Sequence, residues 1–149
     1  LVSILAGAGV RAAVIKHDGH EFEADVPGTD SHRMKKAGAF GTVVYSGTRF
    51  ALVKDQAGLE ARDFFGYFPE ADILLLEGQK NSAYPKIEVL RQEISCSPVC
   101  SPETVLAYVA DCQVSQQGSR EPRQVFAFDQ LDEVAELAIH HMDAVFFKN

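Results

Sequence analysis

The chain has 149 residues, of which 46% are apolar and 23% charged, with a net charge of −7 and a pI near 5.1. This length suits a single domain that buries a core without disulfide or metal support. The acidity is broken by no stripe of Lys and Arg, which excludes a general nucleic-acid binder. No apolar run reaches the roughly 18–20 residues that span a bilayer, and no secretory leader pattern is present. We therefore expect a cytoplasmic protein.

The chain opens in the middle of a helical pattern. Residues 1–8 place Val2, Leu5 and Ala6 on one face but offer no N-terminal cap. Because a helix of this kind needs a start, we expect a segment upstream that is not part of this sequence.

A short apolar run at 11–17 predicts a buried strand, and a polar loop follows at 17–31. Loops of this length inside compact domains are commonly functional. Thr29 or Asp30 is the expected cap of a short helix at 31–37.

Two strand-like runs, 42–46 and 49–54, flank Gly47-Thr48 and predict a tight antiparallel hairpin. Helical spacing then predicts a helix over 59–68, which one glycine weakens. We expect the aromatic side chains of this helix to join the core.

The second half of the chain is richer in strands. Apolar runs predict strands at 72–77, 86–90, 104–110 and 125–128, and a final helix runs from residue 130 to about residue 147. Continuous apolar strands alternating with helices predict a mostly parallel α/β sheet with helices on both faces. The hairpin is an antiparallel addition to that sheet.

Polar loops follow three of these strands, at His17, Glu77 and Asp111. The carboxyl ends of parallel strands share one edge, and ligands bind there. The apolar strand that ends in Glu77 and Gly78 suits a nucleotide site, because the carboxylate faces Mg²⁺ and glycine lets the backbone approach a phosphate. The alternative is a strand that merely ends in an acidic residue.

The loop after the first strand concentrates charged side chains: Lys16, His17, Asp18, His20, Glu21, Glu23 and Asp25. Such a set suits a divalent metal site, a mobile switch that contacts Mg²⁺ and a terminal phosphate, or a solvated acidic loop. Composition leaves these three open. No nucleophile motif stands out, so covalent catalysis has no support.

Three cysteines, Cys96, Cys100 and Cys112, form an odd and sparse set. They provide neither a disulfide framework nor the paired ligands of a zinc finger. We expect three reduced thiols.

Five motifs occur in order: AVIKHDGH at 13–20, DVPGTDS at 25–31, KAGA at 36–39, LLEGQK at 75–80 and YPKIEV at 84–89. With Val-Ala-Asp at 109–111, they resemble the molybdopterin-guanine dinucleotide biosynthesis protein B family over essentially the whole chain. The resemblance implies a P-loop GTP-binding fold, usually a homodimer, that binds GTP and Mg²⁺ with weak GTPase activity. It also implies work beside the guanylyltransferase that joins GMP to molybdopterin.

The resemblance also assigns roles by position. Asp25 and Glu77 are the expected Mg²⁺ ligands, and Asp111 is expected to accept hydrogen bonds from the N1–H and N2–H₂ groups of guanine, a donor pair that adenine lacks. The full set of nucleotide-binding residues that the resemblance implies is Lys16, His17, Asp18, Asp25, Pro27, Gly28, Asp30, Ser31, Glu77, Gly78, Lys80 and Asp111.

The chain departs from the family pattern in one respect. The family starts with a strand and a G-x-x-x-x-G-K-[ST] loop, whereas this sequence contains no Gly-Lys dipeptide. That loop holds phosphates with backbone N–H groups and a lysine, and without it Asp25 and Glu77 would repel the ligand. We expect the strand and the P-loop to lie upstream of Leu1, with residues 1–149 completing a single GTP-binding domain; a truncated or defective product is the alternative.

Three functions remain open. The first is a weak GTPase that supports guanylyl transfer to molybdopterin. The second is a non-catalytic adaptor that binds GTP or the finished cofactor and presents it to the guanylyltransferase or an apoenzyme. The third is a metal-handling protein that uses the charged loop after His17.

Overall fold

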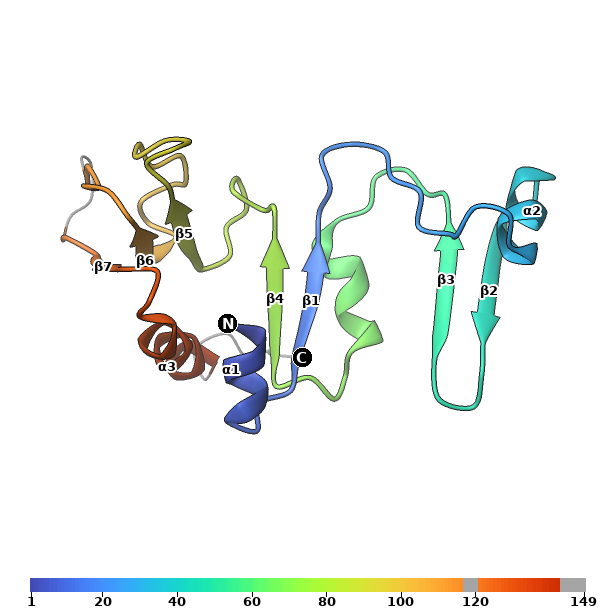
Figure 1. The fold of residues 1–149 in the computed structure, drawn as a ribbon, viewed down its shortest axis with the longest axis horizontal. Coiled ribbons are helices and arrows are strands. Elements are labelled where there is room, and N and C mark those ends of the chain that lie inside the picture. Colours follow the sequence, from blue (N-terminus) through green and yellow to red (C-terminus); the bar gives the residue numbers. More distant parts are fainter. Residues whose placement is uncertain (117–120, 143–149) are drawn as a thin grey trace.

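The computed structural model describes residues 1–116 and 121–142 (Figure 1). The helices are α1 (Val2–Gly7), α2 (Asp30–Lys36), the 3-10 helix η1 (Ala61–Tyr67) and α3 (Leu131–Met142). The strands are β1 (Ala12–Lys16), β2 (Gly41–Tyr45), β3 (Phe50–Lys54), β4 (Ile73–Glu77), β5 (Lys86–Leu90), β6 (Val105–Ala110) and β7 (Gln124–Phe126).

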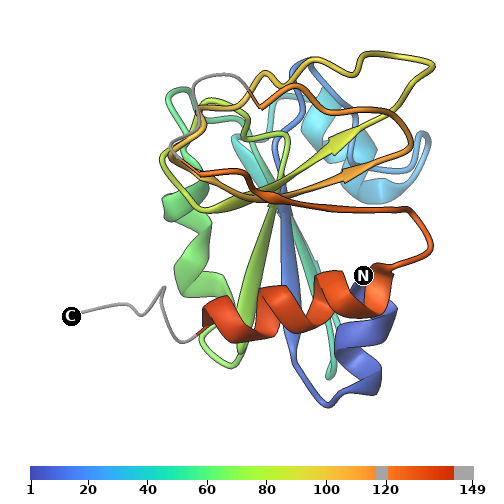
Figure 2. The ribbon, with the colours of Figure 1, turned by 90° about the vertical axis from the view of Figure 1, so that its left-hand side faces the viewer.

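The pairing is mostly parallel, as the sequence predicts. Strand β1 pairs with β4 in parallel, β6 lies between β5 and β7 in parallel, and β2 and β3 form the expected antiparallel hairpin. Helix α1 and η1 lie on opposite sides of the β1–β4 pair, and α1 contacts α3 (Figure 2). The α/β fold class with helices on both faces is therefore confirmed.

One feature of the sheet differs from the expectation: hydrogen bonds divide it into three groups. Among the described residues, β4 pairs only with β1, and β5 pairs only with β6. A cavity of about 1210 Å³ separates them and is lined by residues of both strands. The edges of β4 and β5 that border this cavity thus have no strand partner in the described part of the chain.

The hydrophobic core surrounds β6 rather than β4. Val105, Ala107, Tyr108 and Val109 of β6 are almost fully buried, because β5 and β7 flank the strand on both sides. The apolar residues of β4 are only half-buried, in keeping with its open edge.

The β1–β4 pair is tied at its start by a charged contact. Arg11 donates from its guanidinium to both carboxylate oxygens of Asp72, at 2.7 and 3.0 Å, and its backbone N–H donates to the same carboxylate at 2.8 Å. These hydrogen bonds from Arg11 lower the pKa of Asp72 to about 2. The register that begins here brings Lys16 opposite Glu77 at the other end.

The helices predicted at 59–68 and from residue 130 correspond to η1 and α3. The helix expected at 59–68 is a 3-10 helix, and its aromatic residues are not fully buried: Phe64 and Phe65 are half-buried, and Tyr67 and Phe68 are 54% and 39% exposed. Gly66 weakens α-helix formation there. The final helix is confirmed as far as Met142, and its expected extension to residue 147 lies outside the described residues.

No helix within residues 1–116 and 121–142 has the length and apolar character needed to cross a membrane. The same residues contain no group of three or more His, Cys, Asp or Glu side chains placed to hold a metal ion. The dedicated metal site considered for the loop after His17 is therefore not found there, because its acidic and imidazole groups do not converge.

Candidate functional site

The carboxyl ends of β1 and β4 bring four predicted site residues together. The Lys16 ammonium lies 3.4 Å from the Glu77 carboxylate, and the backbone N–H of His17 donates to the Glu77 carbonyl at 2.9 Å. Both side chains of the ion pair are about 60% exposed. An ion pair so exposed adds little stability. Because the Glu77 carboxylate is exposed, it is accessible to a ligand.

The backbone of Gly78 lies close to the backbone of His17. Its φ is +82°, and a Cβ placed on it would lie 2.5 Å from the carbonyl oxygen of His17. A side chain at this position would therefore collide with the neighbouring strand's backbone while also straining its own. The residue is glycine because the two strand tips are this close.

The loop that follows Gly78 is organised by a lysine. The Lys86 ammonium donates to the carbonyl oxygens of Gln79 and Lys80, both at 3.3 Å, and of Ser82, at 2.6 Å. The predicted site residue Lys80 thus contributes its carbonyl to the loop while its side chain is exposed. Lys86 was not among the predicted site residues, although a lysine that opens an apolar strand is a signal for such a role.

The switch-like segment is a separate, locally bonded unit. One carboxylate oxygen of Asp25 accepts from the hydroxyls of Ser31 and Thr29 and from the N–H of Val26, at 3.0 to 3.3 Å. Thr29 caps α2, as predicted, by accepting from the N–H of His32.

The other predicted residues of this segment also bond locally. The N–H of Gly28 donates to the His32 imidazole, the φ of Gly28 is +88°, and Asp30 forms an exposed ion pair with Arg33. Pro27 precedes this turn, and Asp18, earlier in the loop, accepts from the N–H of His20.

Helix α2, which this segment begins, packs beside the hairpin and is well separated from β4 (Figure 1). All the hydrogen bonds described for Asp25 stay inside its own segment. A shared Mg²⁺ site of Asp25 and Glu77 therefore stays a prediction.

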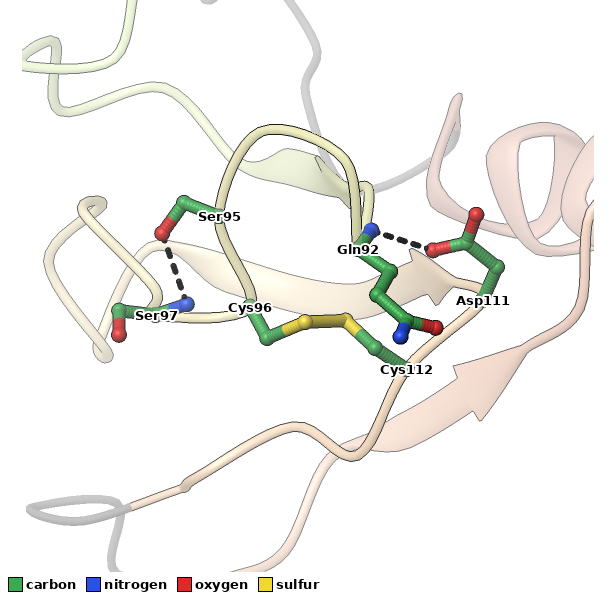
Figure 3. Close-up of a disulfide and its surroundings, with 6 residues drawn as sticks. All are labelled: Gln92, Ser95, Cys96, Ser97, Asp111 and Cys112. Atoms are coloured by element: carbon green, nitrogen blue, oxygen red, sulfur yellow. Dashed lines mark hydrogen bonds between the residues drawn. A yellow bond between two sulfur atoms is a disulfide. The ribbon is translucent and has the colours of Figure 1, made fainter.

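Asp111 lies at the end of β6, on the other parallel group. One of its carboxylate oxygens accepts from the backbone N–H of Gln92 at 2.7 Å, and the second oxygen points away from Gln92 (Figure 3). The exposed side chain thus has one oxygen held by the preceding loop and one directed elsewhere.

The prediction of three reduced thiols is wrong for two of them. Cys96 and Cys112 form a disulfide, with their Cα atoms 6.1 Å apart (Figure 3), and Cys100 is free. Sixteen positions separate the two in sequence, but the parallel crossover from β5 to β6 returns the chain to the same edge. Their spacing along the chain could not show this, because only the strand pairing brings them within bridging distance.

A buried carboxylate supports the same loop. Glu88 is 6% exposed, and one of its oxygens accepts from the N–H groups of Val99 and Cys100, at 2.6 and 3.3 Å. Burial, with a smaller contribution from Glu88, raises the pKa of the Cys100 thiol. Sequence reasoning missed Glu88, and the available signal was an acidic residue inside an apolar strand.

These features define a mixed α/β protein with polar loops at the carboxyl ends of its parallel strands. Residues 1–111 match the family model described as MobB, molybdopterin guanine dinucleotide synthesis protein B. The chain belongs to this family.

Curated relatives agree. The chain is 35% identical over 96 residues to the molybdopterin-guanine dinucleotide biosynthesis adapter protein of Escherichia coli (strain K12), covering 61% of this chain and 55% of that protein. For the protein of the same description from Haemophilus influenzae, identity is 32% over 98 residues, with 64% and 55% covered. The chain thus spans about half the length of the curated relatives it matches.

Solved structures share the fold. The crystal structure of Bacillus subtilis MobB superposes with a TM-score of 0.70 at 24% identity, covering 93% of this chain and 84% of that one. A MobB homolog from Bacillus stearothermophilus gives 0.63 at 17% identity, with 97% and 86% covered. Likeness at these identities shows the fold alone.

Proposed function

We propose that the chain is part of a GTP-binding adapter that assists the attachment of GMP to molybdopterin, in the cytoplasm and beside the guanylyltransferase. The observation that carries this proposal is the meeting of Lys16 and His17 with Glu77 and Gly78 where two parallel strands end. Such strand ends are where α/β proteins bind nucleotides.

Each group has a chemical task in this proposal. Mg²⁺ in nucleotide sites takes one or two carboxylates together with phosphate oxygens, and the exposed carboxylate of Glu77 fits that need. When bound, the ion neutralises phosphate charge. Lys16 adds a positive charge beside the same carboxylate.

The charge of Glu77 also requires a phosphate cradle, which we propose is supplied by a strand and a P-loop upstream of Leu1. Support comes from the open edges of β4 and β5 and from the cavity between them. Unpaired strand edges are templates for a further strand. A strand there would join β1–β4 to β5–β6–β7 and complete one GTP-binding domain over residues 1–149 and the added segment.

We also propose that the protein is a homodimer that uses the β2–β3 hairpin. Several large apolar side chains of the hairpin and its approach are exposed: Phe40, Val43, Val44, Tyr45, Phe50 and Leu52. By the strand register Val43, Tyr45, Phe50 and Leu52 share one face of the hairpin, and exposed apolar patches of this kind mark association surfaces. Light scattering should give twice the monomer mass for the native protein and the monomer mass for Tyr45→Lys; a native monomer refutes the dimer.

The names of the curated relatives favour the adapter role over catalysis. In that role the protein binds GTP, or the finished cofactor or its molybdopterin part, and presents it to the guanylyltransferase or an apoenzyme. Weak GTP hydrolysis is the second candidate, supported by the accessible Glu77 carboxylate beside Lys16.

The test is GTP binding and turnover by the protein with its upstream segment, in Mg²⁺, for Glu77→Ala and for the control Glu70→Ala. Glu70 is an exposed carboxylate just before β4, at the opposite end of that strand. Loss of a charged contact predicts that Glu77→Ala weakens GTP binding at least ~10-fold while Glu70→Ala leaves it unchanged. Equal affinities of the two variants contradict the site, and tight binding with no turnover removes the GTPase candidate.

A further inference from the structure

Hydrogen bonds and a disulfide attach the loop between β5 and β6 to the rest of the fold. Near its start the N–H of Gln92 donates to Asp111, and near its end Glu88 accepts from two N–H groups of the loop. Between them, Cys96 is bonded covalently to Cys112. The loop is thus held at both ends by hydrogen bonds and in the middle by a disulfide.

The disulfide and the Asp111 hydrogen bond act on the same two segments. Asp111 and Cys112 are neighbours in sequence, and Gln92 and Cys96 are four positions apart in the loop (Figure 3). While the bridge is closed, Gln92 cannot move far from Asp111. Once it is open, this part of the loop is held to the end of β6 by the 2.7 Å hydrogen bond from Gln92 and by the pairing of Leu90 with Ala110 just before it.

The two bridged cysteines are also reachable. Cys96 and Cys112 are only half-buried, as is Cys100, whose backbone N–H donates to Glu88. Half-buried disulfides are open to exchange with small thiols, and a reducing compartment such as the one proposed for this protein makes that exchange continuous. The bridge is therefore placed to report the thiol–disulfide balance of its surroundings.

We infer that the Cys96–Cys112 pair is a redox-controlled clamp that positions Asp111 and thereby sets how selectively the protein binds guanine; the second part rests on the proposed function. In the closing step the two thiols react with a low-molecular-weight disulfide. The S–S bond of that disulfide breaks, a new bond joins Cys96 to Cys112, and both cysteine protons end on the two small thiols released. Excess small thiol reverses the step.

The bridged protein holds one Asp111 oxygen against Gln92, which leaves the carboxylate pre-oriented for a ligand through the other oxygen. Pre-orientation strengthens binding because less freedom is lost when the ligand arrives. The reduced protein samples open loop positions, so its Asp111 is less well placed and its preference for GTP over ATP falls.

The first test needs no variant. Amide hydrogen exchange of Gln92 is measured by NMR on the protein with its upstream segment, in oxidised and then reduced small-thiol buffer. Loss of the loop constraint predicts exchange at Gln92 that is roughly 10- to 100-fold faster after reduction. The His17 amide, bonded to the Glu77 carbonyl on the other strand pair, serves as the internal control and should not change. Unchanged exchange at Gln92 overturns the clamp.

Matched variants locate the effect. Cys96→Ser should exchange at Gln92 as the reduced native protein does, in either buffer, whereas Cys100→Ser should keep the full redox response. A redox response that survives Cys96→Ser, or that disappears in Cys100→Ser, overturns the assignment. Because the native protein is compared with itself in the first test, a variant that fails to fold leaves the clamp testable.

The nucleotide readout separates this inference from the proposed function. Titration with GTP and ATP should show a preference for GTP that declines severalfold on reduction. A protein whose Gln92 responds to reduction but which binds no guanine nucleotide in either state refutes the proposed function and retains the clamp. A protein that prefers GTP equally in both states refutes the link between the clamp and guanine selection.

Discussion

Replacing Gly78 by alanine tests the closeness of the two strand tips at the centre of the candidate site. The φ of +82° costs any L-residue about 1 kcal/mol. The new Cβ would also stand 2.5 Å from the His17 carbonyl oxygen, so β1 or β4 must shift. A shift that breaks the hydrogen bond from His17 to Glu77 adds about 1–2 kcal/mol. We therefore expect Gly78→Ala to lower the free energy of unfolding by about 2–3 kcal/mol.

Gly58 provides the control, because its φ is +72° but no atom lies within 4 Å of the position of its missing Cβ. Gly58→Ala should cost only the backbone term, about 1 kcal/mol. The assay is urea unfolding of both variants under identical conditions, with the midpoint and slope compared with those of the native chain. If the two variants lose the same free energy, the steric account of Gly78 is refuted.

Two further predictions follow from contacts outside the nucleotide residues. The pKa of Asp72 is lowered to about 2, so its contact with Arg11 stabilises the fold above the usual carboxyl pKa, and this stabilisation is lost as the pH falls from ~4 toward 2. Asp72→Asn should therefore flatten the dependence of unfolding free energy on pH in that window. An acid profile of Asp72→Asn identical to that of the native chain would contradict this prediction. Lys86→Met should remove the lysine donor from three carbonyl groups, of which only that of Gln79 keeps its hydrogen bonds from Ser82, and should therefore cost about 1–3 kcal/mol and speed proteolysis within residues 78–85; an equally resistant loop would show that the lysine does not organise it.

Much of the architecture could be predicted because the strands are recognisable as runs of apolar residues. Six consecutive apolar residues at 105–110 and four at 73–76 identify parallel strands, and β6 and β4 occupy those positions. The hairpin was equally accessible, since a Gly-Thr turn between two short runs leaves few other options. Side-chain burial in η1 could not be predicted, because the helical spacing of its aromatic residues does not reveal whether another element covers them.

The candidate site was only partly predictable. The position of Lys16 and His17 beside Glu77 and Gly78 could be predicted, because parallel pairing of β1 with β4 aligns the carboxyl ends of the two strands. The disulfide depends on contacts between segments far apart in the chain, which residue spacing does not encode.

The local bonding of Asp25 illustrates a second limit. An acidic residue in a charged loop looks like a metal ligand in the sequence, yet its carboxylate is also a natural partner for the hydroxyl and N–H groups that begin a helix. In the structure one oxygen of Asp25 is used in that way, by Ser31 and Thr29. The other oxygen of Asp25 has no hydrogen bond among the described residues, so the ligand role of Asp25 stays a prediction.

The most direct measurement of the central claim is calorimetric titration of the protein, with the proposed upstream strand and P-loop and with Mg²⁺, against GTP and ATP, repeated for Asp111→Asn. The account predicts that GTP binds at least ~10-fold more tightly than ATP and that Asp111→Asn removes this preference while leaving ATP affinity nearly unchanged. A native protein without preference for GTP, or a variant that loses GTP and ATP binding equally, would contradict it.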